Sequence, residues 1–335
     1  MINFVLRRLA FAVVLVVVVS SASLLLARLA PGDVTAQLGP FASATEIAGT
    51  RARFDLDRTP IGQWGVWLSR AVRFEFGDSF LYNRPVRGLV VSAAANTALL
   101  AVVALVAATI VGIPLGVISG SRQGVLAGAI RAVSLVFLSV PPLLTSLFLV
   151  FLAAVTRWFP AGGMTSVNAS SLDWPAWLLD VGAHLPLPAL ALALPIAATF
   201  ERLQSQSMSD TLQQPFTLAA VARGLSPRDV VLRHAWRVSV RPICGIYGLA
   251  IGAMLSGSFV VEFVTAWPGL GRLMYEALRA RDIYLVAGCA AMGGLFLAAG
   301  SLVGDLLLAA ADPRLREPDP PSPRLRRVRA TGIRA

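Results

Sequence analysis

The amino-acid sequence predicts an all-α membrane protein with six transmembrane helices. Hydrophobic residues make up 56% of its 335 positions and charged residues only 14%, whereas soluble domains contain about 25% charged residues. The apolar residues also collect in runs, and a run of about 20 is long enough to cross a bilayer as a helix. The six expected spans are 9–28, 93–119, 130–156, 185–200, 243–263 and 284–311.

The first span follows Arg7 and Arg8, a placement that a signal peptide could share. Its apolar part is too long for the apolar region of a signal peptide, and the small-x-small cleavage pattern is missing. We therefore expect residues 1–29 to contain an uncleaved first membrane helix.

The long loop 30–92 is expected to contain a short helix of its own. Thr59 and Pro60 fit the cap and the first position of a helix. Apolar residues then recur at helical spacing, at Ile61, Trp64, Leu68 and Ala71. This helix either packs on the outer ends of the spans or lies in the membrane interface, where Trp is favoured.

Prolines interrupt two of the expected spans. Pro141-Pro142 should kink the third span or break its hydrogen bonds. The fourth span, 185–200, is short and contains Pro186, Pro188 and Pro195, which makes it the weakest of the six.

The composition excludes several classes of function. All 29 basic residues are Arg, so the chain lacks the Lys that a P-loop or Schiff-base chemistry requires. Any ATP hydrolysis must then come from another polypeptide. Two Cys and two His are too few for a typical zinc site, and we expect no metal and no cofactor. The net charge of +11 lies in short loops and a tail, which argues against nucleic-acid binding.

The distribution of Arg predicts the orientation in the membrane. With the N-terminus inside, the inner segments hold seventeen Arg and the short outer loops hold four, as the positive-inside rule requires. Both termini are therefore expected in the cytoplasm. The membrane core should cover 93–311, and 312–335 should be a disordered, Arg- and Pro-rich tail.

A basic interruption, "LAAVARGLSPRDVVLRHAWRVSVRP" (218–242), separates the fourth and fifth spans within the loop 201–242. Gln214-Pro215 offers a helix start just before it. Gly224 should end that helix, because the left-handed conformation costs Gly little. The interruption therefore begins with one short helix and a corner.

A second helix is expected after the corner. Ser226 is placed as its N-cap, Pro227 as its first residue and Asp229 as the acid of a capping box, and it should run to about Val240. We call this helix–corner–helix unit (215–240) the elbow. It either docks into a groove on a soluble partner or is an ordinary positive-inside loop with a turn.

The elbow resembles the EAA loop of ABC importer permeases, in which two alanines precede a Gly by five and four positions. Ala219, Ala220 and Gly224 occupy those positions. The Gly-Leu-Ser run at 224–226, the pair Arg233-His234 and Pro242 are similar to the loop of the dipeptide/oligopeptide/nickel importer permeases.

Other motifs extend this resemblance along nearly the whole chain, in the same order as in the family. They are "LRRLAFAVVLVVVVSSASLLLARLAPGD" (6–33), "FDLDRTPIGQW" with "FGDSF…RPV", "VVEFVTAWPGLGRL" (260–273) and "VGDLLLAAADPRLR" (303–316). The outer region is similar to that of the subunit with a long first periplasmic loop. Leu218 and Pro215 depart from the family, which often has charged residues there, so an ion pair through position 218 is not supported.

The resemblance implies the type I ABC importer (MetI-like) permease fold. It also implies a permease subunit of an ATP-driven importer in the bacterial inner membrane, translocating di- or oligopeptides or small solutes such as nickel chelates. The implied partners are a second homologous permease, two ATP-binding subunits and a periplasmic or lipid-anchored solute-binding protein. No residue would be catalytic. The residues expected to couple to the ATPase are Ala219, Ala220, Arg223, Gly224, Ser226, Asp229, Arg233 and His234.

Ionisable groups within the spans need a reason, because they are costly in lipid. Glu262, near the outer end of the fifth span, either serves a gate, pins helices or holds an interfacial position. Asp305, near the inner end of the sixth span, either pairs with an Arg of the elbow or faces a wet cavity. The expected gate or packing set is Glu262, Pro268, Gly269, Gly271 and Asp305.

The spacing Gly248-x-x-x-Gly252 in the fifth span lets helix backbones approach closely. This face packs either against the second permease or within the chain.

Two other classes fit the sequence less well. A secondary transporter more often shows an inverted repeat and charged midplane sites, and no convincing internal repeat is visible here. A membrane-embedded hydrolase needs a positioned nucleophile and base, but His184 and His234 lack an evident Ser partner.

Overall fold

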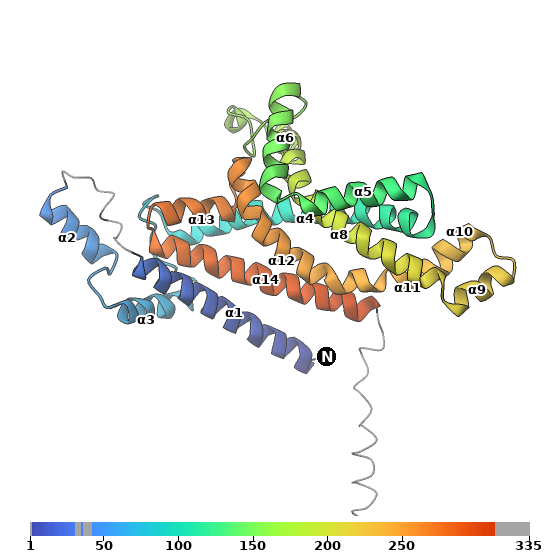
Figure 1. The fold of residues 1–335 in the computed structure, drawn as a ribbon. Coiled ribbons are helices and arrows are strands. Elements are labelled where there is room, and N and C mark those ends of the chain that lie inside the picture. Colours follow the sequence, from blue (N-terminus) through green and yellow to red (C-terminus); the bar gives the residue numbers. More distant parts are fainter. Residues whose placement is uncertain (1, 31–34, 36–41, 312–335) are drawn as a thin grey trace, which may run out of the picture.

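The computed structural model describes residues 2–30, 35 and 42–311, and the predicted tail 312–335 lies outside them. Five of its helices are long and apolar enough to cross a membrane and run along one bundle (Figure 1). They are α1 (Ile2–Leu29), α4 (Val86–Ser121), α8 (Pro186–Leu212), α12 (Arg241–Val264) and α14 (Ile283–Ala311). A bent helix pair lies where the third span was predicted, and the described residues contain six spans if this pair counts as one. The predicted all-α membrane architecture is confirmed. The shorter helices are α2 (Ala44–Arg53), α3 (Pro60–Ala71), α7 (Trp174–His184), α9 (Pro215–Ala222), α10 (Pro227–Asp229), α11 (Trp236–Ser239) and α13 (Leu270–Arg279).

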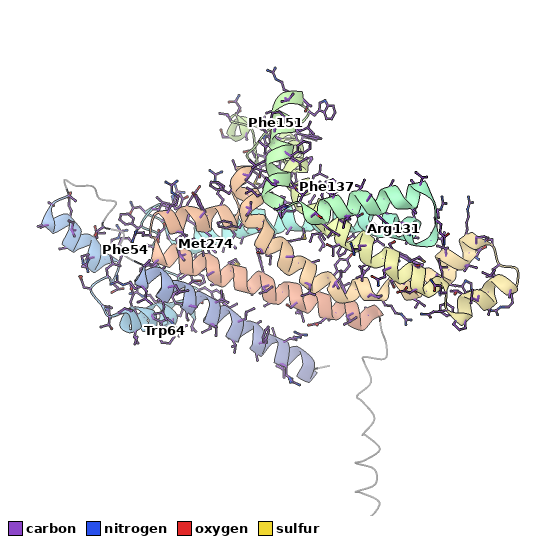
Figure 2. All side chains as sticks on the ribbon, viewed as in Figure 1. Phe54, Trp64, Arg131, Phe137, Phe151 and Met274 are labelled. Atoms are coloured by element: carbon purple, nitrogen blue, oxygen red, sulfur yellow. The ribbon has the colours of Figure 1, made fainter. Side chains whose placement is uncertain are left out.

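The bent pair consists of α5 (Val125–Ser139) and α6 (Pro142–Thr156), whose axes differ by 105°. Pro141 and Pro142 explain the break, because proline has no N–H to donate and its ring clashes with the preceding turn. The predicted interruption is confirmed and is sharper than a kink. α6 therefore projects away from the bundle, carrying exposed apolar side chains such as Phe151 (Figure 2).

α8 is longer than the predicted fourth span, which was wrong at its C-terminal end. The helix continues beyond residue 200 to Leu212 although the sequence becomes polar there. One face of this polar stretch is buried: Met208 is fully buried, and the Gln204 amide donates to the Ser239 hydroxyl at 2.9 Å. Tertiary packing, rather than hydropathy, sets the end of this helix.

α4 and α8 pack against each other along a row of glycines on α4, here called the glycine seam. Gly112, Gly116 and Gly120 recur every four residues and so share one face of the helix. A Cβ atom at Gly112 would lie 2.4 Å from the carbonyl oxygen of Ala197, and one at Gly116 would lie 2.6 Å from that of Glu201. Only glycine permits this approach of the two backbones.

α12 and α14 pack in the same way. Gly248 lies against Gly300 and Gly304, and a Cβ atom at Gly304 would be 2.6 Å from the Gly248 nitrogen. Of the two interpretations of the Gly248-x-x-x-Gly252 face, packing within the chain is therefore confirmed.

The predicted helix of the outer loop is α3. Thr59 caps it as expected, with its hydroxyl accepting the Gly62 N–H at 3.2 Å. Three of the four predicted residues, Trp64, Leu68 and Ala71, pack against a buried cluster, whereas Ile61 is 76% exposed and Trp67, which was not predicted, is buried. Trp67 belongs to a buried cluster with residues of α1 and α14, such as Leu24 and Leu285. The helix therefore packs on the ends of the spans rather than lying free in the interface.

The glycine seam makes a testable prediction about stability. Gly116→Ala should destabilise the protein by about 1–3 kcal/mol, because the added methyl group overpacks α4 against α8. The midpoint of thermal unfolding of the purified protein in detergent measures the effect.

Gly88→Ala on the same helix is the matched control, since a Cβ atom there meets nothing within 4 Å. This control should leave the midpoint unchanged or raise it, because alanine favours helix over glycine. Equal midpoints for the two variants would show that the seam is not tightly packed.

Candidate functional site

The first half of the elbow has the predicted form. α9 begins with Pro215 after Gln214, which is extended, and it ends at Ala222. Gly224 follows with φ +84°, the left-handed conformation that favours glycine. The corner between the two elbow helices is therefore built on Gly224, as predicted.

Thr217 joins α9 to the end of α8, a contact that the sequence pattern did not predict. Its side chain is buried. Its hydroxyl lies 3.0 Å from the carbonyl oxygens of Thr211 and Leu212 and 2.6 Å from that of Gln214. Carbonyl groups at the end of a helix lack hydrogen-bond partners within it, and the Thr217 hydroxyl supplies such a partner to α8. The same contact holds α9 at a fixed angle to α8.

The second half of the elbow starts at the predicted cap. The Ser226 hydroxyl accepts the Asp229 N–H at 3.2 Å and donates to the Asp229 carboxylate at 2.6 Å. Asp229 also pairs with Arg233 at 3.2 Å, and its carbonyl oxygen lies 3.3 Å from Nδ1 of His234. Arg233 and His234, both predicted to couple to the ATPase, therefore contact Asp229 in the first turn of the second helix.

A π-helical segment at Val230–Ala235 separates α10 from α11, and the pattern gave no sign of it. Helix nonetheless continues to Ser239, as predicted, and α12 begins at Arg241. The elbow thus joins α8 to α12 through short helical segments, with breaks at 213–214, 223–226 and Val240. Figure 1 shows it at the end of the bundle opposite α2 and α3.

The two alanines of the elbow have different surroundings. Ala220 is fully buried, whereas Ala219 is exposed. The exposed side also includes Leu218, Val221 and Leu232, each more than half exposed. Arg223 lies next to this apolar surface, with its Nε donating to the Ala219 carbonyl oxygen at 3.2 Å. The elbow therefore presents a small apolar surface edged by Arg.

At the other end of the bundle, Glu262 holds the turn between α12 and α13. Its carboxylate is fully buried. It accepts the backbone N–H groups of Gly271 at 2.7 Å and Arg272 at 3.2 Å, and the Thr97 hydroxyl of α4 at 2.6 Å. The same Thr97 oxygen accepts the Leu270 N–H at 2.7 Å. We call this arrangement the outer clamp.

The glycines after Trp267 are explained by the outer clamp. A Cβ atom at Gly269 would lie 2.3 Å from the Glu262 carboxyl carbon, and one at Gly271 would lie 2.5 Å from Cα of Phe259. The Pro268 carbonyl accepts the Asn96 side-chain amide at 2.8 Å. The predicted residues Glu262, Pro268, Gly269 and Gly271 thus meet in one turn, in which the buried Glu262 carboxylate joins the start of α13 to α4. A role at a gate stays a prediction.

Asp305 does not belong to that group and does not reach the elbow. It pairs with Arg8 of α1, with 2.5 Å between the guanidinium nitrogen and the carboxylate oxygen. The partner is thus an Arg of α1 rather than of the elbow, and a position beside a wet cavity stays a prediction. The pair instead joins the first and last membrane helices.

Glu201 of α8 was missed by the sequence reasoning. It is 1% exposed, and it accepts the Ser119 hydroxyl of α4 at 2.5 Å. The available signal was the pair Glu201-Arg202 directly after an apolar run, where hydropathy placed the end of the span.

These features define an integral membrane protein whose helices carry a rigid elbow at one end and a pinned turn at the other. The chain belongs to the family described as binding-protein-dependent transport system inner membrane component, whose model matches residues 112–317. It is thus a permease subunit of an ABC transporter, and the ATPase lies on separate subunits.

Several relatives match over nearly the whole chain. The oligopeptide transport system permease protein AppB of Bacillus subtilis is 29% identical over 93% of this chain and 98% of its own length. A Brucella suis biovar 1 protein, named as a peptide permease, is 31% identical over 94% of this chain and 99% of its own length. A Sinorhizobium fredii protein, named as a peptide ABC transporter permease, is 31% identical over 93% and 99%.

The outer clamp predicts coupling between two substitutions. Gly269→Ala should destabilise the protein, because its methyl group displaces a carboxylate that three hydrogen bonds hold in place. In a Glu262→Ala background the same methyl group meets open space, so its cost should largely vanish. A double-mutant cycle of thermal unfolding should give a coupling energy of about 0.5–3 kcal/mol.

Gly293→Ala on α14 is the control for this cycle, because a Cβ atom there has nothing within 4 Å. Its effect should add to that of Glu262→Ala. If Gly269→Ala also proves additive with Glu262→Ala, the carboxylate does not occupy the space beside Gly269.

Proposed function

We propose that this chain is one of two homologous permease subunits of an ATP-driven importer for peptides or small solutes such as nickel chelates. The observation that carries the proposal is the elbow, a short helix with an exposed apolar surface, held rigidly at the end of a membrane span. The names of the relatives support peptides as the solute class.

The elbow is built to pass force into the membrane. Docking of α9 in a groove of an ATPase subunit would move α8, because the Thr217 hydroxyl joins the two helices. The glycine seam then transmits that movement to α4 through backbone contact. On the other side, only Val240 separates the second elbow helix from α12. One docking event can therefore move three spans together.

The expected partners follow from the same proposal. ATP would be bound by two separate subunits at the elbow, because this chain has no Lys for a P-loop. The excess of Arg in the predicted inner segments supports a cytoplasmic elbow and cytoplasmic termini. A solute-binding protein would then deliver its cargo at the opposite face, near α2 and α3.

The outer clamp is proposed to serve as part of a gate at the outer face. Glu262 pins the α12–α13 turn against Thr97 of α4, so separation of α4 from α12 would have to break buried hydrogen bonds. Such bonds are costly to leave unmade. Movement of the elbow, passed on through α12, would supply the free energy needed to break these hydrogen bonds.

Ala219→Asp tests the role of the elbow. Ala219 is exposed, so the substitution should leave folding intact, whereas docking would desolvate the new carboxylate at a cost of several kcal/mol. We expect loss of co-purification with the ATPase subunits and loss of ATP-driven peptide uptake. Ala220→Asp is unsuitable, because Ala220 is buried and the substitution would unfold the elbow.

Ala52→Asp is the matched control, since it places the same side chain on an exposed alanine of α2, far from the elbow. Normal ATPase recovery and normal uptake by the Ala219→Asp variant would refute docking at this surface. Uptake that survives loss of the ATPase but stops when ion gradients collapse would identify a secondary transporter instead.

A further inference from the structure

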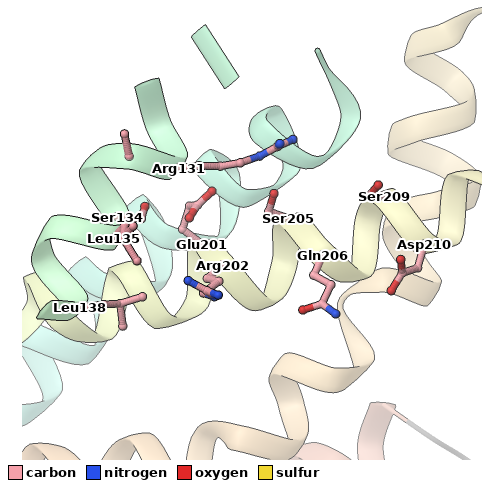
Figure 3. Close-up of a pocket in the computed structure, with 11 residues that line it drawn as sticks. Arg131, Ser134, Leu135, Leu138, Glu201, Arg202, Ser205, Gln206, Ser209 and Asp210 are labelled. Atoms are coloured by element: carbon pink, nitrogen blue, oxygen red, sulfur yellow. The ribbon is translucent and has the colours of Figure 1, made fainter. Parts of the chain in front are cut away.

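A cavity of about 490 Å³ lies between α5 and α8 (Figure 3). Its lining is mostly polar or charged and includes Arg131, Ser134, Glu201, Arg202, Ser205 and Asp210. Figure 3 shows Glu201 and Ser205 extending from α8 toward the side on which Arg131 of α5 lies. None of these residues belongs to the elbow surface or to the outer clamp.

Glu201 is the most deeply placed charge in the cavity. It lies about 16 Å along the helix from the elbow end of α8, at 1.5 Å per residue. Its contact with the Ser119 hydroxyl holds the carboxylate at the cavity wall. The Arg131 guanidinium donates to the Ser119 carbonyl oxygen, which fixes that cation on the facing side.

Three of the residues that line the cavity also reach the surface of α8. Arg202, Gln206 and Asp210 are exposed and recur every four residues, so they form one stripe along the helix. Charged side chains do not face lipid without a large cost. The stripe and the cavity must therefore meet water or a polar ligand.

The two signs of charge are balanced in this cavity. Glu201 and Asp210 are acids, and Arg131 and Arg202 are permanent cations. A ligand carrying one ammonium group and one carboxylate would pair with both kinds of group. A ligand of a single charge would leave one kind unpaired and partly desolvated.

We propose that the α5–α8 cavity is a binding site on the elbow side of the transport path for a zwitterionic solute such as a short peptide. Glu201 receives the ammonium group, and Arg202, with Arg131, receives the carboxylate. This assignment deepens the proposed function and rests on it. The headgroup of phosphatidylethanolamine has the same two charges, so the test must separate a translocated peptide from a lipid.

The test uses the complete transporter in nanodiscs of phosphatidylcholine and phosphatidylglycerol. Gln206→Cys, in a Cys244→Ala/Cys289→Ala background, reports on the cavity through its rate of reaction with a water-soluble methanethiosulfonate. We expect alanyl-alanine to slow this reaction, whereas N-acetyl-alanyl-alanine amide, which carries neither charge, should not. Leu249→Cys, at an exposed apolar position of α12, is the control for this probe. It should react slowly whether or not peptide is present.

Glu201→Gln should weaken the protection by alanyl-alanine about tenfold or more, because it removes a charge-assisted contact. Glutamine still accepts the Ser119 hydroxyl, so the helix packing is kept. Arg202→Gln, at an exposed position, should weaken protection similarly and cannot act through folding. Glu75→Gln, at an exposed carboxylate of the outer segment, is the control and should change nothing.

The proposal is overturned if Gln206→Cys fails to react with the water-soluble reagent or if the uncharged peptide protects equally. It is also overturned if phosphatidylethanolamine protects and the dipeptide does not, since the occupant would then be lipid. ATP-driven uptake by the wild type is measured separately. Loss of this uptake would contradict the proposed importer. Protection of Gln206→Cys is measured without ATP, so it tests the binding site independently of ATP-driven uptake.

Discussion

The close approach of α4 to α8 fixes where the elbow lies and what it can move. Gly112, Gly116 and Gly120 bring the two backbones together over two helical turns, so that α8 cannot tilt without carrying α4 along. The elbow extends from the end of this pair, and Thr217 ties its first helix to the last carbonyls of α8. Interfaces of this density switch between discrete arrangements rather than deforming continuously. Three glycines and the buried Thr217 hydroxyl therefore join α4, α8 and the first elbow helix into one rigid lever.

The outer end of the bundle is held in a different way, by hydrogen bonds rather than by backbone contact. Glu262 gathers two backbone N–H groups and the Thr97 hydroxyl around one buried carboxylate. Such a cluster can open as a unit when its partners separate, whereas a glycine seam resists separation. The proposed function therefore combines a stiff connection on the elbow side with a releasable one at the far side. This combination suits a transporter that opens its two faces in turn.

Local backbone chemistry made much of this structure predictable from the sequence. Pro141-Pro142 breaks a span and Gly224 forms a corner, because proline and glycine act through their own backbone dihedral angles. The end of α8, the Arg8–Asp305 pair and the Thr217 contact were not predictable, because each depends on neighbours distant in the sequence or on burial of polar groups. The motif around Glu262 marked the outer clamp, but only the fold shows that its glycines make room for the carboxylate. Glu201 escaped notice because hydropathy treated it as the end of a span.

An ATPase can act on the elbow only if the elbow faces the compartment that contains ATP. A cysteine at Val221, which is 57% exposed on the elbow, can be labelled with a membrane-impermeant maleimide in sealed vesicles of known sidedness. Labelling in inside-out vesicles and protection in right-side-out vesicles is the expected result. The opposite pattern would place the elbow outside the cell, where no ATPase could act on it, and would contradict the account.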